Sequence, residues 1–345
     1  MTAVAQPVTM TTTGDWIQPV PDLIDPLGIT GWLAGQWLYL PAVSAAFILQ
    51  GMHPVIGDVT DRYSVADRDP AGRAIRSFDA TQQWSYGGKA AIEQGYWLRK
   101  MHRPLQMTAE TGPKAGKHIS ALDPSAYAWV IATAYVTTRQ VAPLFLGRAL
   151  TEDENEQLFA DNVRLAKITQ VPESGYPKSR AEFDDYYQHM LDEVLVLHPA
   201  LAESLPVLSN PALALDELDL GGFPRWVPRT LALGAMKWLL QPLGTFSHAL
   251  TFGAMEPQAR AILDVTWTRR DDRVLRRLFA VYRILFRILP ERLTYSPLAY
   301  YARRHQRVIE RMRNRELRDF TQHDKGEPSA VRRARARRRD GVRTN

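Results

Sequence analysis

The longest uncharged stretch of the chain, residues 26–57, lies near its N-terminal end. It contains no Asp, Glu, Lys or Arg and is long enough to cross a bilayer as a helix. Pro41 near its middle, the amides of Gln36 and Gln50, and the lack of a flanking Lys/Arg cluster argue against a single span. The pattern therefore favours two helices that are broken at Pro41 and buried in a large core, with a membrane span as the alternative.

The next stretch, residues 77–105, has apolar side chains at intervals of three and four, which predicts helix. The pair Gly87 and Gly88 interrupts the pattern, and His102 falls late in the second part. Residues 107–118 are rich in Gly and Lys and contain a proline, so we expect a surface loop that is able to act as a lid.

Helix start signals continue along the rest of the chain. Asp123 before a proline predicts an N-cap, residues 151–154 form a capping-box pattern, and Ser179 precedes another helical segment. Residues 210–223 carry Pro and Gly and predict a connector, whereas residues 271–289 predict an amphipathic helix. No segment shows convincing strand alternation, so we predict an all-α fold.

The composition of the chain excludes several kinds of catalytic and metal site, whereas its length leaves the number of domains open. A chain of 345 residues that is 45% hydrophobic can bury one large core or two small ones. The absence of cysteine excludes disulfides, thiolate nucleophiles, iron–sulfur clusters and a cysteine-ligated haem. Any metal must therefore be held by His, carboxylate or Tyr.

The net charge of +6 is concentrated at the C-terminal end. Residues 331–345 contain seven Arg and one Asp, which gives this stretch +6 and leaves the remaining chain formally neutral. The body is therefore not a basic nucleic-acid-binding surface, and nucleic acid is not an expected partner. We expect residues 326–345 to form a disordered tail; an anionic membrane surface is its alternative partner. Residues 1–14 lack the features of a secretory signal, so a cytoplasmic location is expected, with peripheral membrane attachment as an option.

Histidine offers the clearest candidates for a metal site. The eight histidines are scattered, and no zinc-protease pair, phosphate-binding loop or nucleophile elbow is present. His53 and His102 both lie among apolar residues. On composition alone, a hydrogen-bonded core histidine is the better interpretation of each.

Five segments, taken in order, change that interpretation. They read FILQGMHPVIGDVTDRYSVADRDPAGRAIRSFDA, GYWLRKMHRPLQ, SALDPSAYAWVIAT, EPQARAILDVTW and RILPERLTYSPLAYYARR. Together they resemble the successive motifs of the latex-clearing-protein/MpaB family, roughly over residues 30–305. The resemblance implies a single large helical domain, residues 26–325, that is similar to the globins in architecture and follows an N-terminal extension of residues 1–25. It also implies a pocket for haem b and dioxygen chemistry on an apolar, isoprenoid- or lipid-like substrate.

The resemblance also assigns roles to individual residues. The family's proximal haem ligand maps to His102, and its distal Arg and Lys-Thr pair map to Arg73, Arg76 and Ser77. On a helix these three would lie within about one turn, able to face one pocket or to pair with haem propionates. Tyr63 stands where many relatives have His, which is a departure from the family pattern.

Two further residues are candidates with weaker support. Asp61 lies close in sequence to the distal segment and is a candidate general base. His53 is either a second haem contact or, as we favour, a core hydrogen-bonding residue. The preferred hypothesis is a haem-b oxygenase, and the alternative is a helical haem- or lipid-binding protein without turnover.

Overall fold

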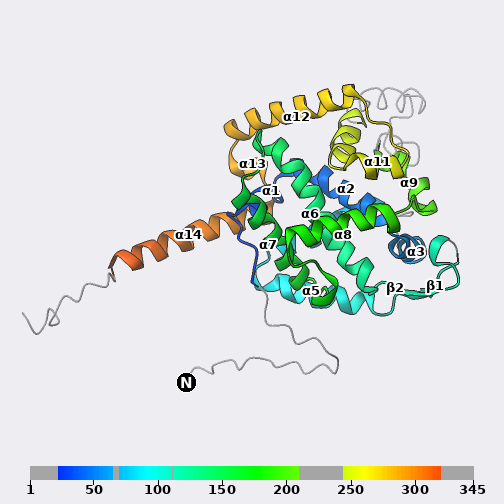
Figure 1. Ribbon diagram of the computed structural model, residues 1–345. Coiled ribbons are helices and arrows are strands. Elements are labelled where there is room, and N and C mark those ends of the chain that lie inside the picture. Colours follow the sequence, from blue (N-terminus) through cyan, green and yellow to red (C-terminus); the bar gives the residue numbers. More distant parts are fainter. Residues whose placement is uncertain (1–21, 65–69, 111, 210–243, 320–345) are drawn as a thin grey trace, which may run out of the picture. The chain divides into compact units, whose positions relative to one another are not determined.

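A computed structural model of the protein describes residues 22–64, 70–110, 112–209 and 244–319. This part of the chain is almost entirely helical, which confirms the predicted all-α class (Figure 1). In chain order its elements are α1 (Ile29–Leu33), η1 (Trp37–Tyr39), α2 (Leu40–Gly51), α3 (Pro54–Tyr63), α4 (Pro70–Tyr86), α5 (Lys89–His102), β1 (Gln106–Thr108), η2 (Gly112–Lys114), β2 (His118–Ser120), α6 (Pro124–Leu146), α7 (Glu152–Ile168), η3 (Glu173–Gly175), α8 (Arg180–His189), the π-helical turn η4 (Met190–Val194), α9 (Pro199–Ser209), α11 (Pro257–Ile262), α12 (Arg269–Ile288), α13 (Glu291–Thr294) and α14 (Pro297–Asp319).

The chain divides into two compact units, residues 1–303 and 304–345. The first unit contains the elements from α1 to the start of α14, and within the second the structure describes the rest of α14. The predicted connector at residues 210–223 and the predicted tail lie outside the described residues. The predicted domain limits therefore stay predictions.

The long helix α6 forms the centre of the first unit. It is predominantly apolar and packs against α1, α2, α7 and α12, with α2 and α7 beside it in Figure 1. Trp129 on α6 is fully buried, and its indole Nε1 donates a hydrogen bond to the main-chain oxygen of Leu49 at 2.8 Å. Tyr135, two turns further on, meets Phe183 edge to face at a ring-centroid distance of 4.6 Å. These contacts tie α2 and α8 to the central helix.

The uncharged stretch near the N-terminus is broken close to Pro41, as predicted, but it forms α1, η1, α2 and the start of α3 rather than two helices. Pro41 lies in the first turn of α2, where its missing N–H costs no helical hydrogen bond, and Pro54 begins α3 in the same way. No single helix of the described part is long and apolar enough to cross a membrane. One pair, residues Trp37–Gly51 with Pro54–Tyr63, meets that test jointly but is bent by 102°.

The predicted helix caps are confirmed at three positions. The Asp123 side chain accepts a hydrogen bond from the amide of Ala126 at 3.0 Å, and Ser179 caps α8 in the same manner. Thr151 and Glu154 form the full reciprocal capping box that opens α7. Such caps stabilise a helix by about 1 kcal/mol each, which fixes where α6 and α7 start.

The loop predicted between residues 107 and 118 is more regular than its sequence indicates. Strands β1 and β2 pair antiparallel, with Gln106 opposite Ser120 and Thr108 opposite His118. Gly112 and Gly116, both at positive φ, allow the connecting turns. The sequence gives no convincing sign of this hairpin, because three-residue strands are too short for alternation to be recognised.

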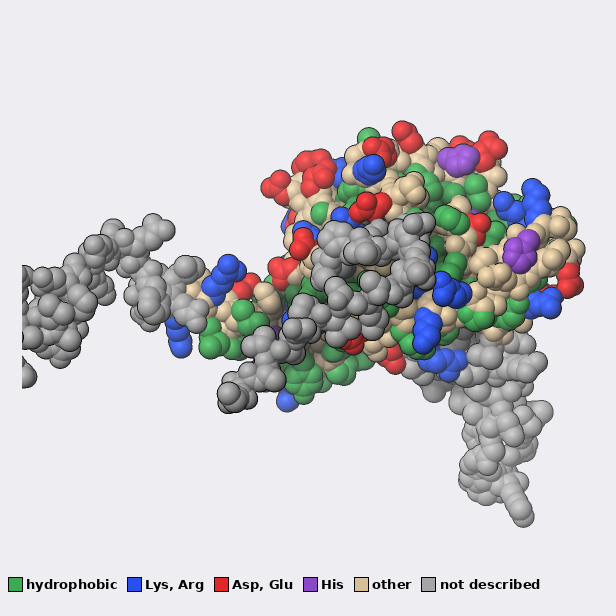
Figure 2. All heavy atoms as spheres, turned by 90° about the horizontal axis from the view of Figure 1, so that it is seen from below, with side chains coloured by type: hydrophobic (Ala, Val, Ile, Leu, Met, Phe, Trp, Pro, Cys, Tyr) green, Lys and Arg blue, Asp and Glu red, His purple; other side chains and the backbone are tan. Residues whose placement is uncertain are grey.

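Charges of both signs cover the surface of the described body. On the face seen in Figure 2, acidic side chains occur mainly along the upper edge, and basic ones lie mostly to the right. This face is not a continuous basic surface, as expected from the balanced charge of the chain outside residues 331–345.

Candidate active site

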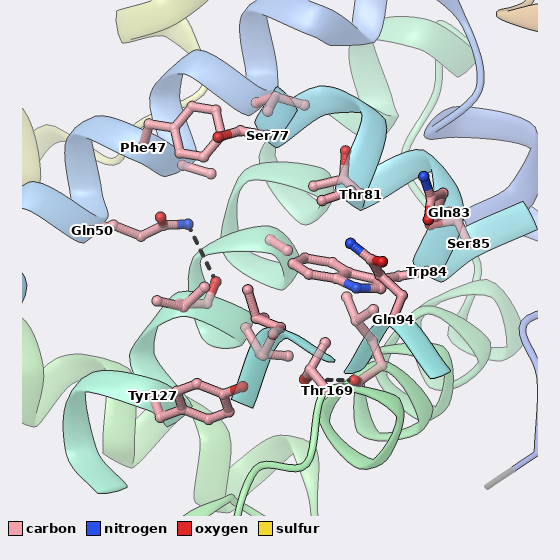
Figure 3. A pocket seen from close by; sticks show the side chains of 18 of the residues that line it. Phe47, Gln50, Ser77, Thr81, Gln83, Trp84, Ser85, Gln94, Tyr127 and Thr169 are labelled. Carbon is pink, nitrogen blue, oxygen red and sulfur yellow. Dashed lines mark hydrogen bonds between the residues drawn. The ribbon is translucent and has the colours of Figure 1, made fainter. Parts of the chain in front are cut away.

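A large cavity lies among α2, α4, α5, α6 and α7. Its volume is about 770 Å³, and most of its lining side chains are apolar. This volume falls within the range of about 300–1,000 Å³ that is typical of small-molecule and cofactor sites. Figure 3 shows part of the lining, with Phe47 and Gln50 coming from α2, Trp84 from α4 and Tyr127 from α6. The cavity is therefore the candidate active site.

The helices reach this cavity through residues at helical spacing. On α6 the lining residues include Tyr127, Val130, Ala134 and Thr138, which are three or four positions apart and so share one face. On α7 the lining residues recur in the same way, from Leu158 through Asp161, Asn162 and Leu165 to Thr169. Since eleven residues of helix rise about 16 Å, the cavity extends along several helical turns.

His102 lines this cavity from the last residue of α5. Its side chain is half-buried, its Nδ1 is buried, and its ring meets that of Tyr127 edge-on at a centroid distance of 6.2 Å. Arg99, one turn earlier, donates to the main-chain oxygen of Gln170 at 3.3 Å and so holds the end of α5 beside the end of α7. Among the cavity residues that the structure describes, His102 is the only histidine.

The predicted distal residues lie on α4. Arg76 and Ser77 both line the cavity, and Figure 3 places Ser77 on the opposite side of it from Tyr127. Arg76 is exposed, so its guanidinium is at the edge of the site rather than deep within it. Arg73 lies one turn earlier on the same helix, and its side chain is outside the described part of the structure. The structure therefore brings Arg76, Ser77 and His102 to one cavity.

The other two predicted residues do not line the cavity. Asp61 is exposed on α3. His53 is buried at the start of α3, with its Nε2 3.4 Å from the hydroxyl of Ser125. Burial lowers the pKa of His53 to about 4, against the opposing effect of Asp123, so its ring is neutral at pH 7. His53 is thus a buried histidine outside the cavity, with one ring nitrogen at a core hydroxyl and Nδ1 buried without a hydrogen bond among the described residues.

The sequence interpretation missed several polar groups of the lining. The amide Nε2 of Gln50 donates to the Thr133 hydroxyl at 3.0 Å. The buried polar atoms of the lining for which no hydrogen bond is seen among the described residues include Trp84 Nε1, Tyr127 Oη and Asp161 Oδ2. Burial raises the pKa of Tyr127 to about 12, opposed by Arg99, so this phenol stays protonated at neutral pH. Each of the three residues lines the cavity.

A family model described as "ER-bound oxygenase mpaB/B'/Rubber oxygenase, catalytic domain" matches residues 31–284, well over half of the chain. The chain belongs to this family. The resemblance stated from the five sequence segments is thereby confirmed. Every cavity residue named above falls within the matched range of the mpaB/rubber oxygenase domain.

Two curated mycobacterial proteins are also similar to this mpaB/rubber oxygenase family member. They are uncharacterized protein Rv2237 of Mycobacterium tuberculosis and uncharacterized protein Mb2261 of Mycobacterium bovis. Each is 27% identical over 194 residues, which cover 55% of this chain and 64% of the relative. The match therefore spans less than two thirds of the length of these relatives. No solved structure matches the chain significantly, so the predicted likeness to the globins stays a prediction.

Proposed function

We propose that the protein is a haem-b-dependent oxygenase that uses dioxygen to oxidise an apolar, isoprenoid- or lipid-like substrate. The observation that carries the proposal is the position of His102 on a large apolar cavity, in a chain that belongs to an oxygenase family. An oxygenase of this kind needs a redox cofactor for dioxygen and an apolar space for the substrate.

The donor set of the cavity fits haem. The described residues contain no group of three or more His, Cys, Asp or Glu side chains that could hold a metal ion by themselves. A haem iron needs only one or two side-chain ligands, because the porphyrin provides the rest. His102 would hold the haem iron, and Arg76, with Arg73 one turn earlier on α4, would bind the carboxylate groups of the haem. When bound, haem would supply the binding and activation of dioxygen.

The protein's own residues would prepare the site around the cofactor. The apolar side chains of α2, α6 and α7 exclude water and hold an apolar substrate. The phenol of Tyr127, protonated at neutral pH, can donate a hydrogen bond to an acceptor inside the cavity. Gln50 is held in place by Thr133, so its amide forms a fixed polar point on an otherwise apolar wall.

The absorption spectrum of the purified protein tests the cofactor assignment. We expect a Soret band that His102→Ala abolishes or strongly shifts, whereas His189→Ala leaves it unchanged. His189 is a suitable control because it is exposed at the end of α8 and does not line the cavity. An unchanged haem spectrum in His102→Ala would contradict the assignment of His102 as ligand.

Turnover separates the oxygenase from its alternative. The reduced protein is supplied with oxygen and many equivalents of a candidate isoprenoid, and the products are analysed. Product beyond one equivalent supports the oxygenase. Stoichiometric binding without product supports a haem- or lipid-binding protein of the same fold.

A further inference from the structure

The cavity reaches the protein surface where α3, α4 and α5 meet. Among the described residues, the exposed side chains of its lining are Tyr63 on α3, Arg76 and Asp79 on α4, and Trp97 and Met101 on α5. Three of them are large and apolar or aromatic, and the remaining two carry opposite charges. These residues therefore mark a mouth of the cavity that is apolar on the sides of α3 and α5.

Trp97 and Met101 belong to a larger exposed face of α5. Gly95 lies against the main chain at the end of α7, so the opposite side of the helix faces outward. Tyr96, Trp97, Lys100 and Met101 lie on this outer side at helical spacing, and the two aromatic side chains are 52% and 54% exposed. Contiguous apolar surface of this kind marks an interaction site, unlike apolar residues that are scattered singly.

The charged residues around this face are mainly basic. Residues 94–109 contain Arg99, Lys100 and Arg103 but no Asp or Glu. Lys100 and Arg103 are exposed, on the same helix end as the apolar side chains. Glu110, which ends the stretch, is paired with Arg62 at 3.2 Å. The face therefore combines apolar side chains with excess positive charge.

The hairpin of β1 and β2 continues this basic surface. In Figure 1 it lies along the same edge of the body as α5. The chain between its strands contains Lys114 and Lys117 and no acidic residue after Glu110. An anionic partner would therefore meet basic side chains on both elements.

A bilayer that contains anionic lipid fits both properties of the face. Trp and Tyr are favoured at the membrane interface, and Lys and Arg near an anionic surface add to the attraction. A second copy of the chain fits less well, because a symmetric contact through this face would bring two sets of cations together. An acidic protein would match the charge but would not explain why the apolar surface is continuous with an apolar cavity.

We propose that the protein docks on a bilayer containing anionic lipid through a mouth patch, which consists of Tyr63, Tyr96, Trp97, Lys100, Met101 and Arg103. The cavity then opens toward the bilayer instead of toward water. The use of this orientation rests on the proposed function, since a lipid-like substrate would pass from the bilayer into the cavity without crossing water.

A fluorescent label tests which face docks, because the chain contains no cysteine and an introduced one is labelled uniquely. A nitrobenzoxadiazole label is attached to full-length Met101→Cys or, as a control, to full-length Ile284→Cys. Ile284 is a matched position, since it is apolar and 59% exposed but lies on α12 and does not line the cavity. With vesicles of phosphatidylcholine and about 30% phosphatidylglycerol, we expect a blue shift and brighter emission at position 101 and no change at position 284.

Three results with these labels would overturn the proposal. The first is emission at position 101 that the vesicles leave unchanged. The second is an equal or larger change at position 284, which would assign the docking to α12. The third is a change at position 101 with polyglutamate in solution but not with vesicles, which would indicate an acidic protein as the partner.

Vesicle flotation of full-length variants measures how much the mouth patch contributes. We expect Trp97→Gln combined with Met101→Gln to lower the partition coefficient about tenfold, because these side chains would no longer enter the interface. Lys100→Gln combined with Arg103→Gln should lower it about tenfold on the anionic vesicles and leave binding to phosphatidylcholine alone unchanged. The Arg-rich residues 331–345 are present in every sample, so they do not contribute to these differences.

A matched apolar pair on α12 is the control for flotation. Ile284 and Ile288 are at least as exposed as Trp97 and Met101, and Ile284→Gln combined with Ile288→Gln should change the partition coefficient by less than about twofold. An equal loss in the two apolar pairs, or no loss in the first, would refute the docking face. If the pair at the mouth does not fold, the labels still decide the question.

The haem spectrum of the same samples keeps this proposal separate from the proposed function. A Soret band in protein that does not dock through the mouth patch would leave the oxygenase standing and remove the docking face. Docking through the mouth patch by protein that never shows the band would do the reverse.

Discussion

At Gly95, α5 lies directly against the main chain at the end of α7. A Cβ atom at Gly95 would overlap the main-chain carbonyl oxygen of Ile168, and this oxygen cannot rotate away as the end of a side chain could. Gly95→Ala should therefore push the two helices apart. The perturbation matters for the site because His102 follows Gly95 by about two turns on the same helix.

The magnitude follows from two opposing effects. Overpacking a well-packed interface costs about 1–3 kcal/mol. Alanine gains at most about 1 kcal/mol over glycine within a helix. We therefore expect Gly95→Ala to lower the free energy of unfolding by about 1–2 kcal/mol.

A second glycine provides the matched control. Gly51 lies in α2, where an added Cβ would meet only the Leu201 side chain, at 3.4 Å, which is ordinary van der Waals contact. Gly51→Ala should leave the free energy of unfolding unchanged or raise it by up to about 1 kcal/mol. Urea unfolding followed by far-ultraviolet circular dichroism measures both variants. If Gly95→Ala proved as stable as Gly51→Ala, the close contact between α5 and α7 would be refuted.

Two other predictions concern pH and the C-terminal tail. Burial lowers the pKa of His53 to about 4, so between about pH 6.5 and 4 the unfolded chain binds a proton at this residue more readily than the folded chain does. The free energy of unfolding should therefore fall by up to about 3 kcal/mol as the pH drops through that window. Unfolding of His53→Gln, compared with the unaltered protein at pH 7 and pH 4.5, measures this loss; an identical pH dependence in both would contradict it. For the tail, we expect protein lacking residues 326–345 to float less with vesicles containing anionic lipid, because residues 331–345 carry +6. Equal flotation of the two forms with anionic vesicles would remove the tail from membrane binding. Flotation of the full-length protein that is as strong with neutral vesicles as with anionic ones would do the same.

The features that the sequence predicts well depend on local physics. The caps at Asp123, Thr151 and Ser179 involve partners three residues away, so both partners of each hydrogen bond lie within one short segment of the sequence. The same holds for the start of α2 at Pro41, since proline is favoured in the first turn of a helix. The hairpin of β1 and β2 escaped prediction because its pairing depends on the geometry of the chain between the strands.

The two histidines show where local patterns stop being informative. His53 and His102 both lie among large apolar residues in the sequence, and composition gives no reason to choose between them. In the structure, His53 lies outside the cavity beside Ser125, whereas His102 lines the cavity. The family resemblance favours His102 from the sequence alone, but the physical distinction between the residues is tertiary.

Asp161 and Asn162 raise the same problem in a sharper form. Both interrupt the apolar face of α7, and from the sequence either is a polar residue satisfied in the core or a candidate ligand contact. Their hydrogen bonds separate them. Asn162 is bonded through both polar atoms of its amide to distant segments, whereas Asp161 accepts a hydrogen bond from Arg164, three residues further along the same helix. Asn162 bonds to residues 31 and 14 positions away, distances at which no helical periodicity gives information. The surroundings of these two adjacent polar residues are therefore set by tertiary contacts, which only the folded chain reveals.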